Sequence, residues 1–286
     1  MIRNTIIVVT LILVALLPFV TKSHDVNLVY GIRTNFDLNY STSKDKFHTL
    51  DLYIPKKRSG KKPALIVWIH GGGWREGNKS DTPAIDIARE GFAVASINYR
   101  LVPDSVFPAQ IDDCIQAIEW LSGQGDKYGF DNTRIGVWGL SAGGHLAALV
   151  GTSTGLTQAV CDWCGPTDMF TFRQQCKPNA LFRDSSAADM VDDLLGGTPE
   201  EKHDLAVAAS PISFASPNDP PFLIMHSEGD PIVPFEQSKE LFEALKKAKA
   251  DVQLIKIPGQ DHVFMDETNF GKAIDFFQTK LNKNVK

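Results

Sequence analysis

The sequence predicts one α/β domain with a mostly parallel central sheet and helices on both faces. Stretches of strand length alternate with stretches of helical periodicity along most of the chain, and parallel strands need such crossover connections. Several strand-like stretches are continuously apolar, such as residues 64–69, as expected for strands covered on both sides. A chain of 286 residues is also long enough for one large domain of this kind.

The alternation defines each element in turn. The predicted strands, in chain order, are residues 28–32, 49–54, 64–69, 92–97, 135–138, 159–163, 221–226 and 252–257. Pro108 opens a helix whose apolar residues, from Ile111 to Leu121, recur on one face. Further helices are expected directly after the strand 135–138, and over 237–248 and 270–281. Residues 169–203 interrupt the alternation with a long polar stretch, which predicts a cap-like insertion lying over the functional site.

The first 23 residues have the layout of a signal peptide. Arg3 precedes an apolar run over residues 6–20, and small residues follow near a cleavage point. The run is short for a membrane span, which needs ~20 apolar residues. We therefore expect a cleaved signal over 1–23, an exported α/β domain over 24–286, and no stable membrane insertion after cleavage. An uncleaved N-terminal anchor is the alternative, and it also places the domain outside the cytoplasm.

Charge and composition argue against a nucleic-acid partner. The chain carries 34 acidic and 29 basic side chains, for a net charge of −5, and no basic stripe stands out. A nucleic-acid-binding surface requires such a basic footprint. The sequence does not indicate an oligomeric state.

Four cysteines suit an exported protein with zero to two disulfides. Cys161 and Cys164 form a C-x-x-C at a strand end, but no second such pair and no nearby histidine accompany them, which disfavours a metal site. Ordinary packing, or a loop-tying bond from Cys161 or Cys164 to Cys176, is the preferred interpretation. The fourth cysteine, Cys114, lies in the helix that Pro108 opens.

Ser141 is the candidate nucleophile. It lies in a Gly139-x-Ser-x-Gly143 turn that follows the predicted strand 135–138 and opens a predicted helix. A tight strand-to-helix turn lifts a serine hydroxyl clear of its neighbours, and flanking glycines remove the Cβ clashes of such a turn. A surface serine in a glycine-rich turn is the alternative, and the placement after a buried strand argues against it.

A glycine loop after the strand 64–69 supplies candidate oxyanion donors. In His70-Gly-Gly-Gly-Trp74, consecutive glycines let backbone N–H groups point at a substrate oxygen. Gly72 and Gly73, together with the N–H of Ala142, are the expected oxyanion hole, with the N–H of Trp74 a competing donor. His70 itself is interpreted as a structural hydrogen-bonding residue.

The general base and its acid are expected late in the chain. Among the seven histidines, His262 lies in a loop between the last strand and the last helix, where it can reach the serine. Asp230 follows the strand 221–226 and is the expected acid that orients the imidazole. Glu228 and Asp261 are its rivals. The resulting order along the chain, Ser then Asp then His, is the one used by α/β-hydrolases.

These motifs together resemble the α/β-hydrolase esterases of the hormone-sensitive-lipase-like group, and more closely the bacterial acetylxylan and feruloyl esterase-like branch. The resemblance covers roughly residues 45–281. It rests on the segments 70–74, 98–101, 107–110, 139–144, 165–168, 194–197 and 209–211 and on the Asp230 and His262 loops. It implies the α/β-hydrolase fold with a short cap.

The resemblance also implies a serine esterase that hydrolyses short acyl esters, often on plant polysaccharides, through an acyl-enzyme and with no metal or cofactor. Export is compatible with a polymeric substrate. An exopeptidase or arylformamidase of the same fold is the alternative, although the chain has no room for the N-terminal propeller usual in related exopeptidases. A non-catalytic binding module is a further alternative, disfavoured because all three triad positions are filled.

Overall fold

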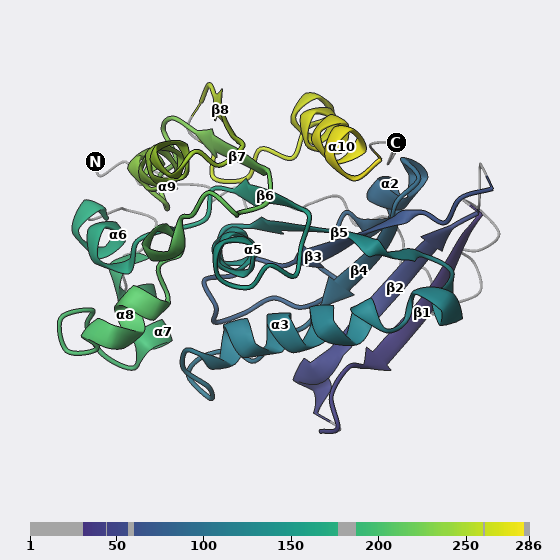
Figure 1. Cartoon of the computed structure of the whole chain (residues 1–286). Coiled ribbons are helices and arrows are strands. Elements are labelled where there is room, and N and C mark those ends of the chain that lie inside the picture. Colours follow the sequence, from purple (N-terminus) through teal and green to yellow (C-terminus); the bar gives the residue numbers. More distant parts are fainter. Residues whose placement is uncertain (1–30, 44, 57–59, 177–186, 260, 283–286) are drawn as a thin grey trace, which may run out of the picture.

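The computed structural model describes residues 31–43, 45–56, 60–176, 187–259 and 261–282. Within them, one eight-stranded sheet has the order β1-β2-β4-β3-β5-β6-β7-β8 (Figure 1). The six strands β3 to β8 are parallel to one another. At one edge, β2 pairs antiparallel with both β4 and the outermost strand β1. Their bounds are β1 Ile32–Asn39, β2 Thr49–Pro55, β3 Ala64–Ile69, β4 Ala93–Ile97, β5 Asp131–Leu140, β6 Ala159–Trp163, β7 Phe222–Ser227 and β8 Val252–Ile257. The predicted mostly parallel sheet is confirmed.

The sequence did not predict β1, which runs over Ile32–Asn39. Of the predicted strand 28–32, residues 28–30 lie outside the described part of the chain and Gly31 is not in a strand. β1 is an antiparallel edge strand, and most of its residues are only partly buried. Its sequence is therefore largely polar and lacks the continuous apolar run that marks the inner strands.

Helices cover both faces of the sheet (Figure 1). On one face lie α3 (Ala109–Ser122), α5 (Ala142–Ser153) and α9 (Phe235–Ala248). On the other lie α2 (Ala84–Arg89) and α10 (Glu267–Leu281). The predicted helices 237–248 and 270–281 correspond to α9 and α10, while α2 and the single-turn α4 (Gly125–Tyr128) are too short to show helical periodicity.

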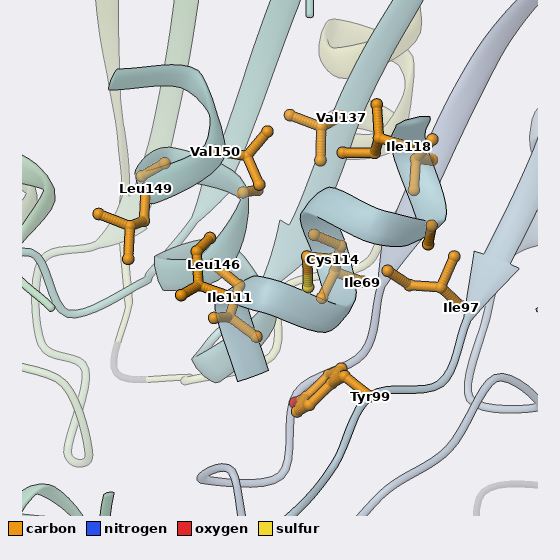
Figure 2. Close-up of a cluster of buried hydrophobic side chains, with 14 of the residues drawn as sticks. Ile69, Ile97, Tyr99, Ile111, Cys114, Ile118, Val137, Leu146, Leu149 and Val150 are labelled. Atoms are coloured by element: carbon orange, nitrogen blue, oxygen red, sulfur yellow. The ribbon is translucent and has the colours of Figure 1, made fainter. Parts of the chain in front are cut away.

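Alternating side chains of each strand divide the core into two layers. In β3, Leu65 and Val67 face the α3 and α5 side, whereas Ile66 and Trp68 face the α10 side. Figure 2 shows part of the first layer, in which α3 and α5 pack against β3, β4 and β5. Its residues include Ile69, Ile97, Ile111, Cys114, Ile118, Val137, Leu146 and Val150. Because both faces are packed, the position of α5, and with it of the serine turn, is fixed by the core.

In its described residues, the predicted insertion 169–203 contains two helices and the start of a third. These are α6 (Met169–Gln175), α7 (Ala187–Leu195) and α8 (His203–Ala208), and residues 177–186 are outside the described part. The predicted signal segment 1–23 is also outside it. Among the residues that are described, no helix is long and apolar enough to cross a membrane.

Candidate active site

The candidate residues lie at the carboxyl edge of the parallel sheet, after β5, β7 and β8. Ser141 directly follows β5 and is the N-cap of α5, with backbone angles φ 57° and ψ −122°. This strained conformation is rare for a residue with a side chain. A hydrogen bond from its N–H to Trp163 O, 2.8 Å long, fixes the turn to the end of β6. A Cβ at Gly139 or Gly143 would collide with nearby backbone, so both positions require glycine.

The glycine loop after β3 runs beside the serine turn. A Cβ on Gly71 would lie 3.4 Å from the Cβ of Ser141, which shows how closely the two segments approach. Gly72, Gly73 and Trp74 all have positive φ, at 104°, 58° and 60°. In the described residues, the N–H groups of these three and of Ala142 donate no hydrogen bond to the protein. Unpaired N–H groups of this kind can donate hydrogen bonds to a substrate oxyanion.

Asp230 and His262 are hydrogen-bonded to each other. The Nδ1 of His262 donates to Oδ2 of Asp230 over 2.7 Å, and Oδ1 accepts the N–H groups of Ile232 and Val233 at 2.8 and 3.0 Å. Burial alone would raise the pKa of Asp230, but hydrogen bonds from His226 and His262 and their nearby charge hold that pKa well below its usual range. The carboxylate is therefore ionised and oriented towards the His262 ring.

His226 was identified from the sequence only as the end of a strand. The structure shows it fully buried, with Nε2 donating to Oδ2 of Asp230 at 3.2 Å and to Val233 O at 2.9 Å. Its Nδ1 lies 2.7 Å from the Oγ of Ser238 in α9. The available sequence signal for this contact was the position of His226 four residues before Asp230, with the end of β7 between them. Asp230 thus lies between two imidazoles.

The two rival acids occupy different surroundings. Glu228 is about half exposed, and its carboxylate lies 3.4 Å from the Nζ of Lys256. Asp261 is exposed and lines a pocket of about 410 Å³ together with neighbouring residues of the His262 loop. Of the three candidate acids, Asp230 has a hydrogen bond to His262 in the described structure.

Two other histidines near the turn have structural contacts. His70 is buried, donates from Nδ1 to Gly71 O at 2.8 Å, and stacks on Tyr99 with ring centroids 4.3 Å apart. Burial lowers the pKa of His70, so the ring is neutral. His145, one turn into α5, contacts Trp74 and Ala209 rather than the serine hydroxyl.

All four cysteines have free thiols, so the loop-tying disulfide to Cys176 is not formed. Cys161 and Cys164 are fully buried and Cys176 partly buried, which agrees with the alternative of ordinary packing. Cys164, at φ 47°, donates from Sγ to the carbonyl of His262 over 3.3 Å. The Cys164 thiol therefore helps to hold the His262 loop in place.

One group in the described part of the chain has metal-ligand chemistry. Ligand atoms of Cys164, Asp230 and His262 lie within 4.8 Å of one another. Burial, together with the charges of Asp230 and Asp162, raises the pKa of Cys164, so its sulfur is a protonated thiol rather than a thiolate ligand. The carboxylate and imidazole are already bonded to each other. The group is thus better suited to proton transfer than to holding a metal.

A family described as BD-FAE matches residues 50–245, more than half of the chain. The matched segment contains Ser141, Asp230 and the glycine loop, and it ends before His262. It also spans β2 to β7 and the insertion.

Individual proteins agree with this match. Esterase LipC of Mycobacterium tuberculosis is 30% identical over 236 residues, which cover 77% of this chain and 58% of LipC. The chain spans a little over half the length of the curated relatives that it matches first, at 58, 52 and 56%. Among solved structures, a truncated carbohydrate esterase from gut microbiota superposes with a TM-score of 0.79 at 31% identity, covering 87% of this chain and 96% of that one. The bifunctional GH43-CE protein of Bacteroides eggerthii gives 0.77 at 31%, covering 86% and 38%.

Proposed function

We propose that this chain, which belongs to the BD-FAE family of α/β-hydrolase esterases, is a serine esterase with Ser141 as nucleophile, His262 as base and Asp230 as orienting acid. The observation that carries the proposal is the 2.7 Å hydrogen bond between Asp230 and His262, at the sheet edge where Ser141 occupies a strained turn. Such a constellation activates a hydroxyl that is otherwise a poor nucleophile.

The reaction follows from the roles of these groups. Nε2 of His262 takes the proton of the Ser141 hydroxyl as its oxygen attacks the ester carbonyl. The N–H groups of Gly72, Gly73 and Ala142 hold the oxyanion. His262 then gives the proton to the departing alcohol, leaving an acyl-enzyme, and finally activates the water that releases the acid. Ionised Asp230 stabilises the transient imidazolium.

The substrate class that we propose is short acyl esters of carbohydrates. It is supported by the two solved structures at 31% identity, which are named as a carbohydrate esterase and a GH43-CE protein. We further propose that residues 1–23 direct export, which would bring the enzyme to a polymer outside the cell. We also propose that residues 169–203 form a cap over the active site.

Replacing Ser141 with alanine is the direct test. We expect Ser141→Ala to lose at least about 10⁴-fold in kcat on p-nitrophenyl acetate while its circular dichroism spectrum and Tm stay close to wild type. A fluorophosphonate probe should label the wild-type protein and not the variant. Retention of most activity in Ser141→Ala would refute the nucleophile assignment.

The substrate class needs a separate screen. Purified protein is compared on acetylated xylan, feruloylated sugars, aryl esters and dipeptide anilides. We expect acetate release from the acylated sugars and little anilide cleavage. Faster anilide cleavage would favour a peptidase of the same fold, and a folded protein that the probe does not label would favour a binding module.

A further inference from the structure

Trp74 connects the glycine loop to the helix that carries the nucleophile. Its φ of 60° is unfavourable for a residue with a large side chain, and it follows two glycines that also have positive φ. The loop therefore needs a tertiary contact to keep this conformation. The indole provides one: it is 1% exposed, and its Nε1–H donates to Nδ1 of His145 over 3.2 Å.

The hydrogen bonds of His145 define a single protonation state. Its Nε2 lies 2.6 Å from the carbonyl of Ala209, which can only accept, so Nε2 carries the proton. Its Nδ1 faces an indole N–H, which can only donate, so Nδ1 is bare. Burial lowers the pKa of His145 to about 4, with the bond to Ala209 opposing the shift, which keeps the ring neutral.

The three partners come from three different segments. Trp74 belongs to the glycine loop, His145 to the start of α5, and Ala209 to the C-cap of α8, beyond the insertion 169–203. The indole and imidazole planes meet at 89°, with centroids 5.2 Å apart. Since His145 is 0% exposed, neither of its nitrogens can be satisfied by solvent if a partner is lost.

We propose that His145 is a positioning residue, which holds Trp74 and thereby the oxyanion donors of the glycine loop in register with Ser141. This inference rests on the proposed esterase function. It differs from a general packing role because it predicts an effect on the oxyanion, which forms only in the transition state, and not on substrate binding. Loosening the loop displaces N–H donors, each of which is worth ~10²–10³ in rate when removed outright.

Three variants isolate the bond. His145→Leu removes both nitrogens, and His145→Gln restores one donor and one acceptor. Trp74→Phe keeps an aromatic ring but removes the indole N–H together with part of the buried ring. His48→Leu is the matched control, because His48 is another buried histidine, bonded to Asp113 and Ser43. Each protein is measured for Tm, for kcat and KM on p-nitrophenyl acetate per site labelled by fluorophosphonate, and for the Ki of an aryl trifluoromethyl ketone.

We expect His145→Leu to lower kcat about 10- to 100-fold with KM within about threefold, and to raise Ki for the ketone by a similar factor. Trp74→Phe should show the same pattern. The double variant should lose no more kcat than the more impaired of the two single variants. His145→Gln should recover to within about threefold of wild type. His48→Leu should lower Tm without changing kcat.

Wild-type kcat and Ki in folded His145→Leu, or losses that multiply in the double variant, would overturn the positioning role. If His145→Leu does not fold, Trp74→Phe alone decides by the same criteria. A wild-type protein that neither hydrolyses esters nor reacts with the probe would instead refute the proposed function, so the two failures are distinguishable.

Discussion

Asp230 shows how individual contacts tune one side chain of the site. It accepts four hydrogen bonds, two from backbone N–H groups and one from each of two histidines. These bonds outweigh its burial, so the pKa of Asp230 stays below its usual range and the carboxylate remains charged. A charged and fixed acid keeps the proton of His262 on Nδ1, which leaves Nε2 free for its proposed role as base.

Replacing Asp230 with asparagine tests this role. We expect Asp230→Asn to lower kcat by on the order of 10⁴, because the amide no longer selects the correct tautomer or stabilises the imidazolium. The measurement is kcat per folded protein on p-nitrophenyl acetate. Glu228→Gln is the matched control and should remain within about threefold, since Glu228 pairs with Lys256 at the surface. The opposite ranking would transfer the acid role to Glu228.

Asp162 is a second buried carboxyl close to the site. It is the penultimate residue of β6, two residues before Cys164. Its Oδ1 accepts the N–H of Gly165 at 2.8 Å, and within the described structure its Oδ2 has no partner. Complete burial raises the pKa of Asp162 to about 6, although the Gly165 bond and nearby His226 oppose the shift. The folded protein therefore retains the Asp162 proton to higher pH than the unfolded chain does.

This has a defined consequence for stability. The contribution of Asp162 is most favourable below about pH 4 and is lost as pH rises towards 6, because the buried group must then ionise. We expect Asp162→Asn to raise the free energy of unfolding at pH 7.5 by about 2–3 kcal/mol and to change it little at pH 4. Urea unfolding at the two pH values measures this. Equal effects at both would show that ionisation of Asp162 is not the cause.

Sequence patterns are enough to propose the reacting side chains, but not the residues that support them. Ser141 lies in a local motif, and Asp230 and His262 follow strands whose carboxyl ends share one edge, so pattern and topology suffice to propose them. The contacts of His226, Cys164 and His145 depend on which strands are neighbours and which face each side chain takes. Such information is not contained in the local spacing of motifs along the sequence.

At the scale of elements, α7 packs against the glycine loop and the residue that follows it. Nε of Arg75, directly after Trp74, donates to Asp193 of α7 over 2.7 Å. A Cβ on Gly73 would lie 2.8 Å from the sulfur of Met190 in the same helix. The helix of the insertion and the candidate oxyanion loop are therefore packed as one unit.

Gly73→Ala probes this packing. At φ 58°, alanine adds about 1–2 kcal/mol of backbone strain, and its Cβ presses on Met190. We expect kcat to fall by about tenfold or more with a smaller change in KM, because the loop shifts away from the oxyanion. Kinetics of Gly73→Ala, Met190→Ala and the double variant test this. Met190→Ala should partly restore the double variant, whereas no restoration would attribute the whole effect to strain.

At the scale of the whole molecule, the alternation of strands and helices predicted the parallel sheet and its edge strand β8, but not the antiparallel edge strand β1. The helices of the insertion were interpreted only as a polar stretch. The hydrophobic core explains the difference. Inner strands and covering helices bury continuous apolar faces, whereas β1 and the insertion have one face at the surface and a weaker pattern.

The C-terminal helix closes this core on the side opposite α5. Phe277 in α10 lies with its ring centroid 5.7 Å from that of Trp138 in β5 and 6.3 Å from that of Phe92. Gly136 in β5 permits this approach, since a Cβ there would lie 2.6 Å from the Phe277 ring. Helix α10 thus joins residues late in the chain to the central strands, although it begins only a few residues after His262.

Phe277→Ala separates global stability from the chemistry at the sheet edge. We expect it to lower the free energy of unfolding by about 3–5 kcal/mol, because the cavity opens in the core and Phe277 is fully buried. At 20 °C, kcat per probe-labelled site should stay within about twofold of wild type, since Asp230 and Cys164 hold the His262 loop independently of α10. Thr279→Ala, on the exposed face of α10, is the control and should change stability by less than about 0.5 kcal/mol. A normal Tm with a large loss of kcat would instead make α10 a local support of the His262 loop.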